Sequence, residues 1–330
     1  MGEVKLTDGM PVTGADVLVP RVPGDPAWGL RVSDRFEVSN TNEIPWELAK
    51  HRSRYHGAGV CYRVPAHLRA AAWALEHPGH TVSGFAALAL YGLSFFVDGC
   101  DTVLTSPRVR RTQGPTAARP KLMRADTPPS ELWHVTCRGT RVPVVVPGLA
   151  VVQALQEVRR GSNGWEVLDV GEARFVRAVQ LLDATQAHLN INPLDVLRAA
   201  RNRLDLRWVA EALAASSQLA DSPKETEMRL IAAALAEKYG LVLQEQVPVK
   251  HGGTWVTSFD LALIDAQSDL KVGLMYDGEH HAGREQMQKD SLINIETGVQ
   301  GWRYFRFTRK TLPMMYNRLD AFFASQLGPR

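Results

Sequence analysis

The chain has 330 residues, of which 45% are hydrophobic and 22% charged, and its formal net charge is +3. This length leaves room for two domains, and the composition is ordinary for a soluble globular protein. The mildly basic balance is compatible with nucleic-acid binding but not diagnostic of it. The longest apolar run, 85–97, is too short to cross a bilayer, and the first residues lack the pattern of a signal peptide. The three cysteines are widely spaced, so we expect reduced thiols in a cytoplasmic protein that is not bound to a membrane.

The first part of the chain is predicted to be a mixed α/β domain over residues 31–217. Residues 1–30 are rich in Gly, Pro and Val without periodicity, so we expect them to be extended or disordered. The apolar patterns that follow predict strands at 60–64, 102–105, 132–136 and 142–146. They predict helices at 46–51, from about 65, at 83–92, 151–158, 173–182 and 193–215. The histidines here lack metal-ligand spacing, and we interpret them as structural or exposed.

Residues 218–330 are predicted to form a second domain. Ser222 at an N-cap, Pro223 after it and Glu225 at the third position predict the start of a helix, which Gly240 ends. The pattern then predicts strands at 243–249, 254–264 and 271–276, a helix at 282–297, a strand at 301–308 and a helix at 312–327. The predicted order is therefore helix, three strands, helix, strand, helix.

Two strands of this domain carry residues that packing alone does not require. One apolar strand ends in Asp277-Gly278-Glu279-His280-His281, and the preceding strand contains Asp260. Carboxylates and imidazoles at a strand end suit metal binding and proton transfer in a hydrolase. Because side chains alternate along a strand, Asp260 and Asp277 could reach one metal ion if their faces coincide.

Residues 222–310 resemble the very-short-patch-repair endonuclease-like domains of the PD-(D/E)XK nuclease superfamily. The matching segments are 222–225, Gln246, 259–260, 276–281, 289–290 and 301–303. The resemblance implies a restriction-endonuclease-like α/β/α core, a Mg²⁺ or Mn²⁺ ion bound by Asp260 and Asp277, and hydrolysis of DNA. The candidate catalytic residues are Glu225, Asp260, Asp277, His280, His281 and Asp290.

The sequence departs from this family at two positions. Met275 occupies the position where the family usually has Glu, and Asn294 the position of a usual arginine. A thioether cannot replace a hard carboxylate ligand for Mg²⁺. Either the site is rebuilt from Asp277 and a histidine, or it is inactive and needs no cofactor. A purely structural role is the alternative for three of these residues. Glu225 could cap a helix, Asp277 could form a turn with Gly278, and Asp290 could be an exposed helix residue.

Residues 35–215 more loosely resemble the DNA-binding antitoxin of abortive-infection type IV systems, through segments 80–93, 103–107 and 142–154. The winged helix usual at the start of that family is hard to see. Segment 108–124 contains no acidic residue and six basic ones: Arg108, Arg110, Arg111, Arg119, Lys121 and Arg124. Such a segment suits phosphate contacts, although a solvated loop is the alternative.

These observations lead to competing functional hypotheses. The first is a metal-dependent DNA endonuclease or a nuclease-derived DNA-binding protein; the resemblance implies a setting in defence, mobile-element or phage biology. The second is a non-catalytic transcriptional regulator, either antitoxin-like or a phage repressor, that retains a degenerate nuclease fold. The third and weakest is a protein–protein module that neutralises a toxin. DNA is the expected partner, and a homodimer is left open.

Overall fold

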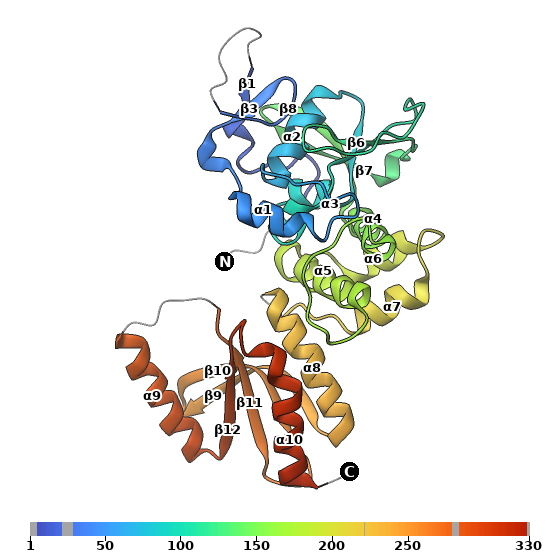
Figure 1. Cartoon of the computed structure of the whole chain (residues 1–330). Helices are drawn as coiled ribbons and strands as arrows, with labels where there is room; N and C mark the ends of the chain where they lie inside the picture. Colours follow the sequence, from blue (N-terminus) through green and yellow to red (C-terminus); the bar gives the residue numbers. More distant parts are fainter. Residues whose placement is uncertain (1–4, 22–28, 221, 279–283, 329–330) are drawn as a thin grey trace. The chain divides into compact units, whose positions relative to one another are not determined.

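The computed structural model describes residues 5–21, 29–220, 222–278 and 284–328, and it leaves the side chains of 284–290 undescribed. The chain divides into two compact units, whose elements are labelled in Figure 1. The N-terminal unit comprises Met1–Val167 with Arg174–Gln218, and the C-terminal unit comprises Leu168–Ala173 with Leu219–Arg330. The sequence placed a boundary between 217 and 218 but did not anticipate that the short segment 168–173 belongs with the C-terminal unit.

Both units combine helices with sheets, which confirms the predicted mixed α/β class. The N-terminal unit has a five-stranded sheet of order β6-β5-β4-β8-β7 and a three-stranded sheet of order β1-β3-β2. The larger sheet consists of β4 (Thr81–Ser83), β5 (Val103–Thr105), β6 (Lys121–Met123), β7 (Leu132–Cys137) and β8 (Thr140–Val145). The smaller sheet consists of β1 (Val19–Pro20), β2 (Leu30–Arg31) and β3 (Phe36–Val38).

The helices of the N-terminal unit follow the predicted order, except that one predicted helix is two. They are α1 (Trp46–Ser53), α2 (Ala66–Glu76), α3 (Gly84–Leu90), α4 (Pro147–Arg160), α5 (Ala173–Leu189), α6 (Pro193–Ala200) and α7 (Leu206–Ala214), with 3₁₀ turns η1 (Ala15–Val17), η2 (Asn40–Asn42), η3 (Val97–Gly99) and η4 (Pro129–Glu131). The predicted helix over 193–215 is two helices, because the Asp205 side chain accepts hydrogen bonds from the amides of Arg207 and Trp208 and starts α7. The predicted strand over 60–64 is wrong, since these residues form no strand.

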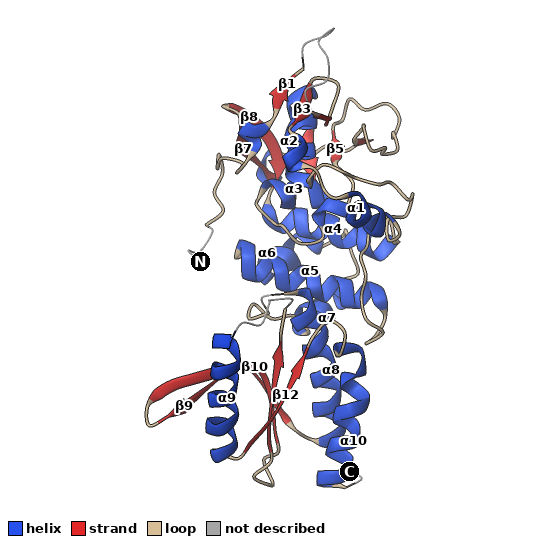
Figure 2. Ribbon diagram, turned by 60° about the vertical axis from the view of Figure 1, so that its left-hand side comes forward, coloured by secondary structure: helices blue, strands red, loops and turns tan. Residues whose placement is uncertain are grey.

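The C-terminal unit is a four-stranded sheet between helices. The strand order is β12-β11-β10-β9, with β11 and β12 parallel and the other two pairs antiparallel. Figure 2 shows α9 on one face of this sheet and α8 with α10 on the other, which is a three-layer α/β/α arrangement. The elements are α8 (Pro223–Tyr239), β9 (Val242–His251), β10 (Thr254–Ile264), β11 (Lys271–Tyr276), α9 (Arg284–Val299), β12 (Trp302–Phe307), η5 (Leu312–Met314) and α10 (Met315–Leu327).

The two faces of the sheet are packed differently. Toward α8 and α10, alternate apolar residues of the strands form one buried cluster, which includes Leu261, Leu263, Val272, Leu274, Leu235 and Phe323. On the other side, the Phe259 ring lies 5.0 Å from the Trp302 ring, centroid to centroid. A Cβ at Gly273 would lie 2.6 Å from the Phe259 ring, so β11 has room only for glycine at this position.

Segment 168–173 is anchored to the C-terminal unit by a buried glutamate. The Glu227 side chain is fully buried, and its Oε1 accepts a hydrogen bond of 3.2 Å from the Leu168 amide. Its Oε2 lies 2.7 Å from Lys224 Nζ, which balances the buried charge. Leu168 and Val170 then pack against the apolar cluster. Helix α8 and the upstream segment 168–173 are thus joined through one buried carboxylate.

Candidate functional site

Asp260 is partly buried at an irregular point of the sheet. The β9–β10 ladder pairs Phe259 with Val247 and Leu261 with Glu245, which leaves Asp260 opposite Gln246, a residue with φ of 50°. The ladder to β11 ends with Leu261 paired to Leu274. Beyond that end, Asp260 Oδ2 accepts a 2.6 Å hydrogen bond from the Tyr276 amide. The Asp260 carboxylate therefore replaces a backbone carbonyl in holding the end of β11 to β10.

Asp277 follows β11 directly and is bound on its other side by β12. Its amide donates a 2.8 Å hydrogen bond to the Phe307 carbonyl, and its Oδ2 lies 3.7 Å from Arg306 Nη1. The Asp277 side chain is 43% exposed, so this ion pair is only partly shielded from solvent. The structure thus brings Asp260 to the residue that precedes Asp277, and it adds Arg306, a cation that the sequence interpretation had missed.

The other predicted catalytic residues have different settings. Glu225 takes part in the N-cap of α8: Ser222 Oγ accepts from the Glu225 amide at 3.3 Å and donates to Glu225 Oε1 at 2.9 Å. His280 and His281 lie outside the described residues. Asp290 lies within α9, but its side chain is also outside the described set. Within the described ranges, no group of three or more His, Cys, Asp or Glu side chains has the geometry of a metal site.

The basic segment 108–124 is an ordered connection between β5 and the edge strand β6. Gln113 and Leu122 exchange backbone hydrogen bonds, and Thr116 and Arg119 do the same around a tight turn. Five arginines of the segment are exposed: Arg108, Arg110, Arg111, Arg119 and Arg124. Within the part of the chain that the structure describes, none of these five side chains forms an ion pair or a hydrogen bond. The segment therefore presents positive charge that no described acidic group neutralises, and backbone hydrogen bonds hold it in place.

Lys121, the sixth basic residue, has a different environment. Its Nζ lies 3.9 Å from Oδ2 of Asp101, a carboxylate that is only 4% exposed. Asp101 Oδ1 accepts from Tyr62 Oη at 2.8 Å and contacts His56 Nε2 at 2.6 Å. His56 Nδ1 accepts from two backbone amides, so the ring proton lies on Nε2 and is donated to Asp101. This buried network was not predicted from the sequence.

The hydrogen bonds of this network keep the Asp101 carboxyl ionised. Burial alone would raise the pKa of this carboxyl, but the hydrogen bonds from His56 and Tyr62 outweigh burial and hold the pKa below its usual range. Arg69 secures the same loop, donating to the carbonyls of Asp98 at 2.9 Å and of Cys100 at 3.1 Å. Asp101 is therefore an ionised group in a loop that several hydrogen bonds hold in place.

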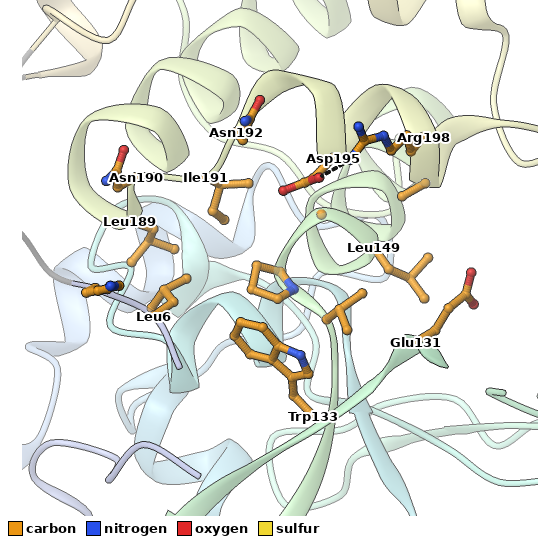
Figure 3. Close-up of a pocket in the computed structure, with 15 residues that line it drawn as sticks. Leu6, Glu131, Trp133, Leu149, Leu189, Asn190, Ile191, Asn192, Asp195 and Arg198 are labelled. Carbon is orange, nitrogen blue, oxygen red and sulfur yellow. Dashed lines mark hydrogen bonds and ion pairs between the residues drawn. The ribbon is translucent and has the colours of Figure 1, made fainter. Parts of the chain in front are cut away.

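A cavity of about 570 Å³ lies elsewhere in the N-terminal unit, among η4, β7 and the first residues of α4 and α6 (Figure 3). Its walls are mostly apolar and include Leu6, Trp133, Leu149, Leu189 and Ile191. Its two lining carboxylates are paired with arginines: Asp195 Oδ1 accepts from Arg198 at 3.1 Å, and both Glu131 oxygens accept from Arg203 at 2.8 Å. The volume suits a small molecule. Its residues come from separate segments that no sequence motif marks.

Comparisons with protein families, with curated proteins and with solved structures found no match to this chain. Among the helices in the described ranges, none combines the length and the apolar character that a membrane crossing requires.

Proposed function

We propose that this chain is a DNA-binding protein that contacts phosphates through segment 108–124 and whose C-terminal unit is a nuclease-derived α/β/α domain. The observation that carries the proposal is the set of five exposed arginines without an ionic partner among the described residues. Elsewhere in the same unit, Arg52, Arg159 and Arg203 each pair with a carboxylate. Exposed cations on an ordered backbone suit the regular negative charge of DNA.

The salt dependence of DNA binding tests this proposal. Each arginine–phosphate contact releases condensed counterions, so the combined variant Arg108→Gln, Arg110→Gln, Arg111→Gln should reduce the slope of log affinity against log salt by about 2 to 3 units. The measurement is fluorescence anisotropy with a labelled DNA duplex at several KCl concentrations.

A variant with the same change of net charge serves as the control. Arg198, Arg201 and Arg207 lie on α6, α7 and the turn between them, and Arg198 and Arg207 pair with acids on their own helices. Replacing these three by glutamine should leave the slope near that of the parent. An equal loss of slope in both variants, or no binding by the parent, would contradict the proposal.

A second candidate function is metal-dependent cleavage of DNA, and the placement of two carboxylates favours it. Asp260, within β10, accepts a hydrogen bond from the amide of Tyr276, the residue that precedes Asp277 at the end of β11. These two residues would hold a Mg²⁺ or Mn²⁺ ion, which would neutralise phosphate charge and activate water. Arg306 beside Asp277 competes with such an ion for the carboxylate. This function is therefore ranked below DNA binding without cleavage.

Met275→Glu tests the second candidate. Met275 pairs with Arg306 on β12, and continuing the β10–β11 register by one residue places it opposite Asp260. The new carboxylate would crowd Asp260 and Asp277, so the melting temperature should fall by several degrees without metal. If the site is only weakened, Mn²⁺ should restore part of this loss by binding the folded state, and a plasmid should be nicked slowly.

Met275→Gln is the matched control, because the glutamine side chain has nearly the same shape as that of glutamate but carries no charge. Its melting temperature should not respond to Mn²⁺. If Met275→Glu is equally indifferent to Mn²⁺ and does not nick plasmid, metal-dependent cleavage is excluded as a latent property of this site, and DNA binding without cleavage remains the proposed function.

A further inference from the structure

A second cavity in the N-terminal unit, of about 320 Å³, is continuous with the basic segment. Pro115 and Lys121 of that segment line it, together with Asp101, Arg160 and Ser162. Arg160 is the last residue of α4, and Ser162 follows after Gly161, which ends the helix in the left-handed conformation with φ of 71°. The turn after α4 and the edge strand β6 therefore contribute to one cavity.

Three lining side chains of the cavity carry hydrogen-bond donors that form no hydrogen bond with the described residues. The Arg160 side chain is exposed and has no ion pair or hydrogen bond with the described residues. The Ser162 hydroxyl, on a partly buried residue, also has no hydrogen bond with them. Lys121 Nζ has one carboxylate oxygen at 3.9 Å, which is longer than a hydrogen bond. Guanidinium, ammonium and hydroxyl groups together present several donors, which a ligand with several acceptor oxygens can satisfy.

The charges in the cavity favour an anion. Asp101 is its one carboxylate among the described lining residues. That carboxylate is already engaged, through Oδ1 by His56 and Tyr62 and through Oδ2 by Lys121. Among the lining side chains, Arg160 therefore remains as one surplus positive charge, which the buried Glu157 nearby opposes only in part. A phosphodiester, with one negative charge, matches both the donors and this charge, and a phosphate dianion matches the donors.

We infer that this cavity binds one phosphate group, with Arg160, Lys121 and Ser162 as the donors. The inference rests on the proposed DNA binding for the source of the ligand: a backbone phosphate adjoining those bound by the arginines of segment 108–124. The same chemistry would accept free phosphate, and the experiment separates the two sources.

Arg160→Gln tests the inference with little risk to the fold, because the side chain is exposed and has no described partner. In the DNA anisotropy assay, the variant should lower the salt slope by about one unit and weaken binding about fivefold at moderate salt. Ser162→Ala should weaken binding about threefold with an unchanged slope, because a hydroxyl carries no charge. Arg201→Gln, an exposed arginine after α6, is the charge-matched control and should match the parent.

A parallel titration with inorganic phosphate, followed by ³¹P NMR, separates failure of this inference from failure of the proposed function. If the parent binds DNA and Arg160→Gln behaves like Arg201→Gln in both assays, the phosphate site is overturned and the proposed function stands. If the parent does not bind DNA but binds inorganic phosphate in an Arg160-dependent way, the site stands with free phosphate as its source. Binding of neither ligand overturns the site.

Discussion

Replacing Asp101 by alanine is expected to destabilise the N-terminal unit by about 3 to 5 kcal/mol, the usual cost of breaking a buried charged network. The change leaves the His56 Nε2–H and the Tyr62 hydroxyl without their acceptor, and both side chains are buried. It also removes the carboxylate nearest to Lys121. Urea unfolding followed by circular dichroism, together with hydrogen exchange of α4 amides, measures the loss in this unit.

Asp101→Asn separates charge from hydrogen bonding. Its amide oxygen can still accept from His56 or Tyr62, so its loss of stability should fall between the parent and Asp101→Ala. The pKa of Asp101 is lowered in the folded state, so its contribution is present above the ordinary carboxyl pKa of about 4 and disappears as the pH falls through the folded value. A loss below about 1 kcal/mol for Asp101→Ala at pH 7 would show that the network is not needed for stability.

Local chemistry was sufficient to predict much of the C-terminal unit. The strands at 254–264 and 271–276 were predicted with the bounds that the structure shows, because apolar alternation and turn residues specify them within the segment itself. The helix 223–239 was equally evident, since Ser222 caps its start and Gly240, with φ of 67°, ends it. Elements of this kind depend on residues that are neighbours in sequence.

Several failures occur where a side chain takes the place of a backbone hydrogen-bond partner. Residues 60–64 have a strand-like composition, but the Val60 amide donates to His56 Nδ1 and the Val64 carbonyl accepts from Arg69. These bonds take groups that a sheet ladder would use, so no strand forms. At the candidate nuclease site the sequence selected Asp260, but it could not show that the Asp260 carboxylate binds the Tyr276 amide.

The same reasoning explains why the His56–Asp101 network was missed. The two residues are separated by 45 positions, and nothing in the sequence relates them. The basic segment, in contrast, was evident from composition, because charge without acidic residues is a local property. What composition could not predict is that Lys121 differs from its neighbours: it is half-buried against Asp101, whereas the five arginines are exposed. Segment 108–124 therefore combines a surface role with a structural one.

Glu157 lies on α4 near this network, and its replacement by glutamine should stabilise the protein in a pH-dependent way. The side chain is buried, and burial raises its pKa to about 7, although Lys121 opposes the shift. In the unfolded chain the group ionises near pH 4.3, so between that pH and about 7 the unfolded state loses a proton that the folded state keeps. Stability from this group is therefore full in acid and falls as the pH rises to about 7.

Glu157→Gln removes this ionisation. Glutamine keeps an oxygen that can accept a hydrogen bond from the side-chain amide of Asn163, which now donates to Glu157. At pH 8 the variant should exceed the parent by about 2 to 3 kcal/mol in the free energy of unfolding, and at pH 5 by about 1 kcal/mol or less. Glu47→Gln, an exposed position on α1, is the control and should change little at either pH. Urea unfolding at pH 5, 6, 7 and 8 gives the measurement. The free energy of unfolding of Glu157→Gln could instead differ from that of the parent by the same amount from pH 5 to 8. That result would mean that Glu157 does not titrate in this range, and that the charges near α4 are balanced without its protonation.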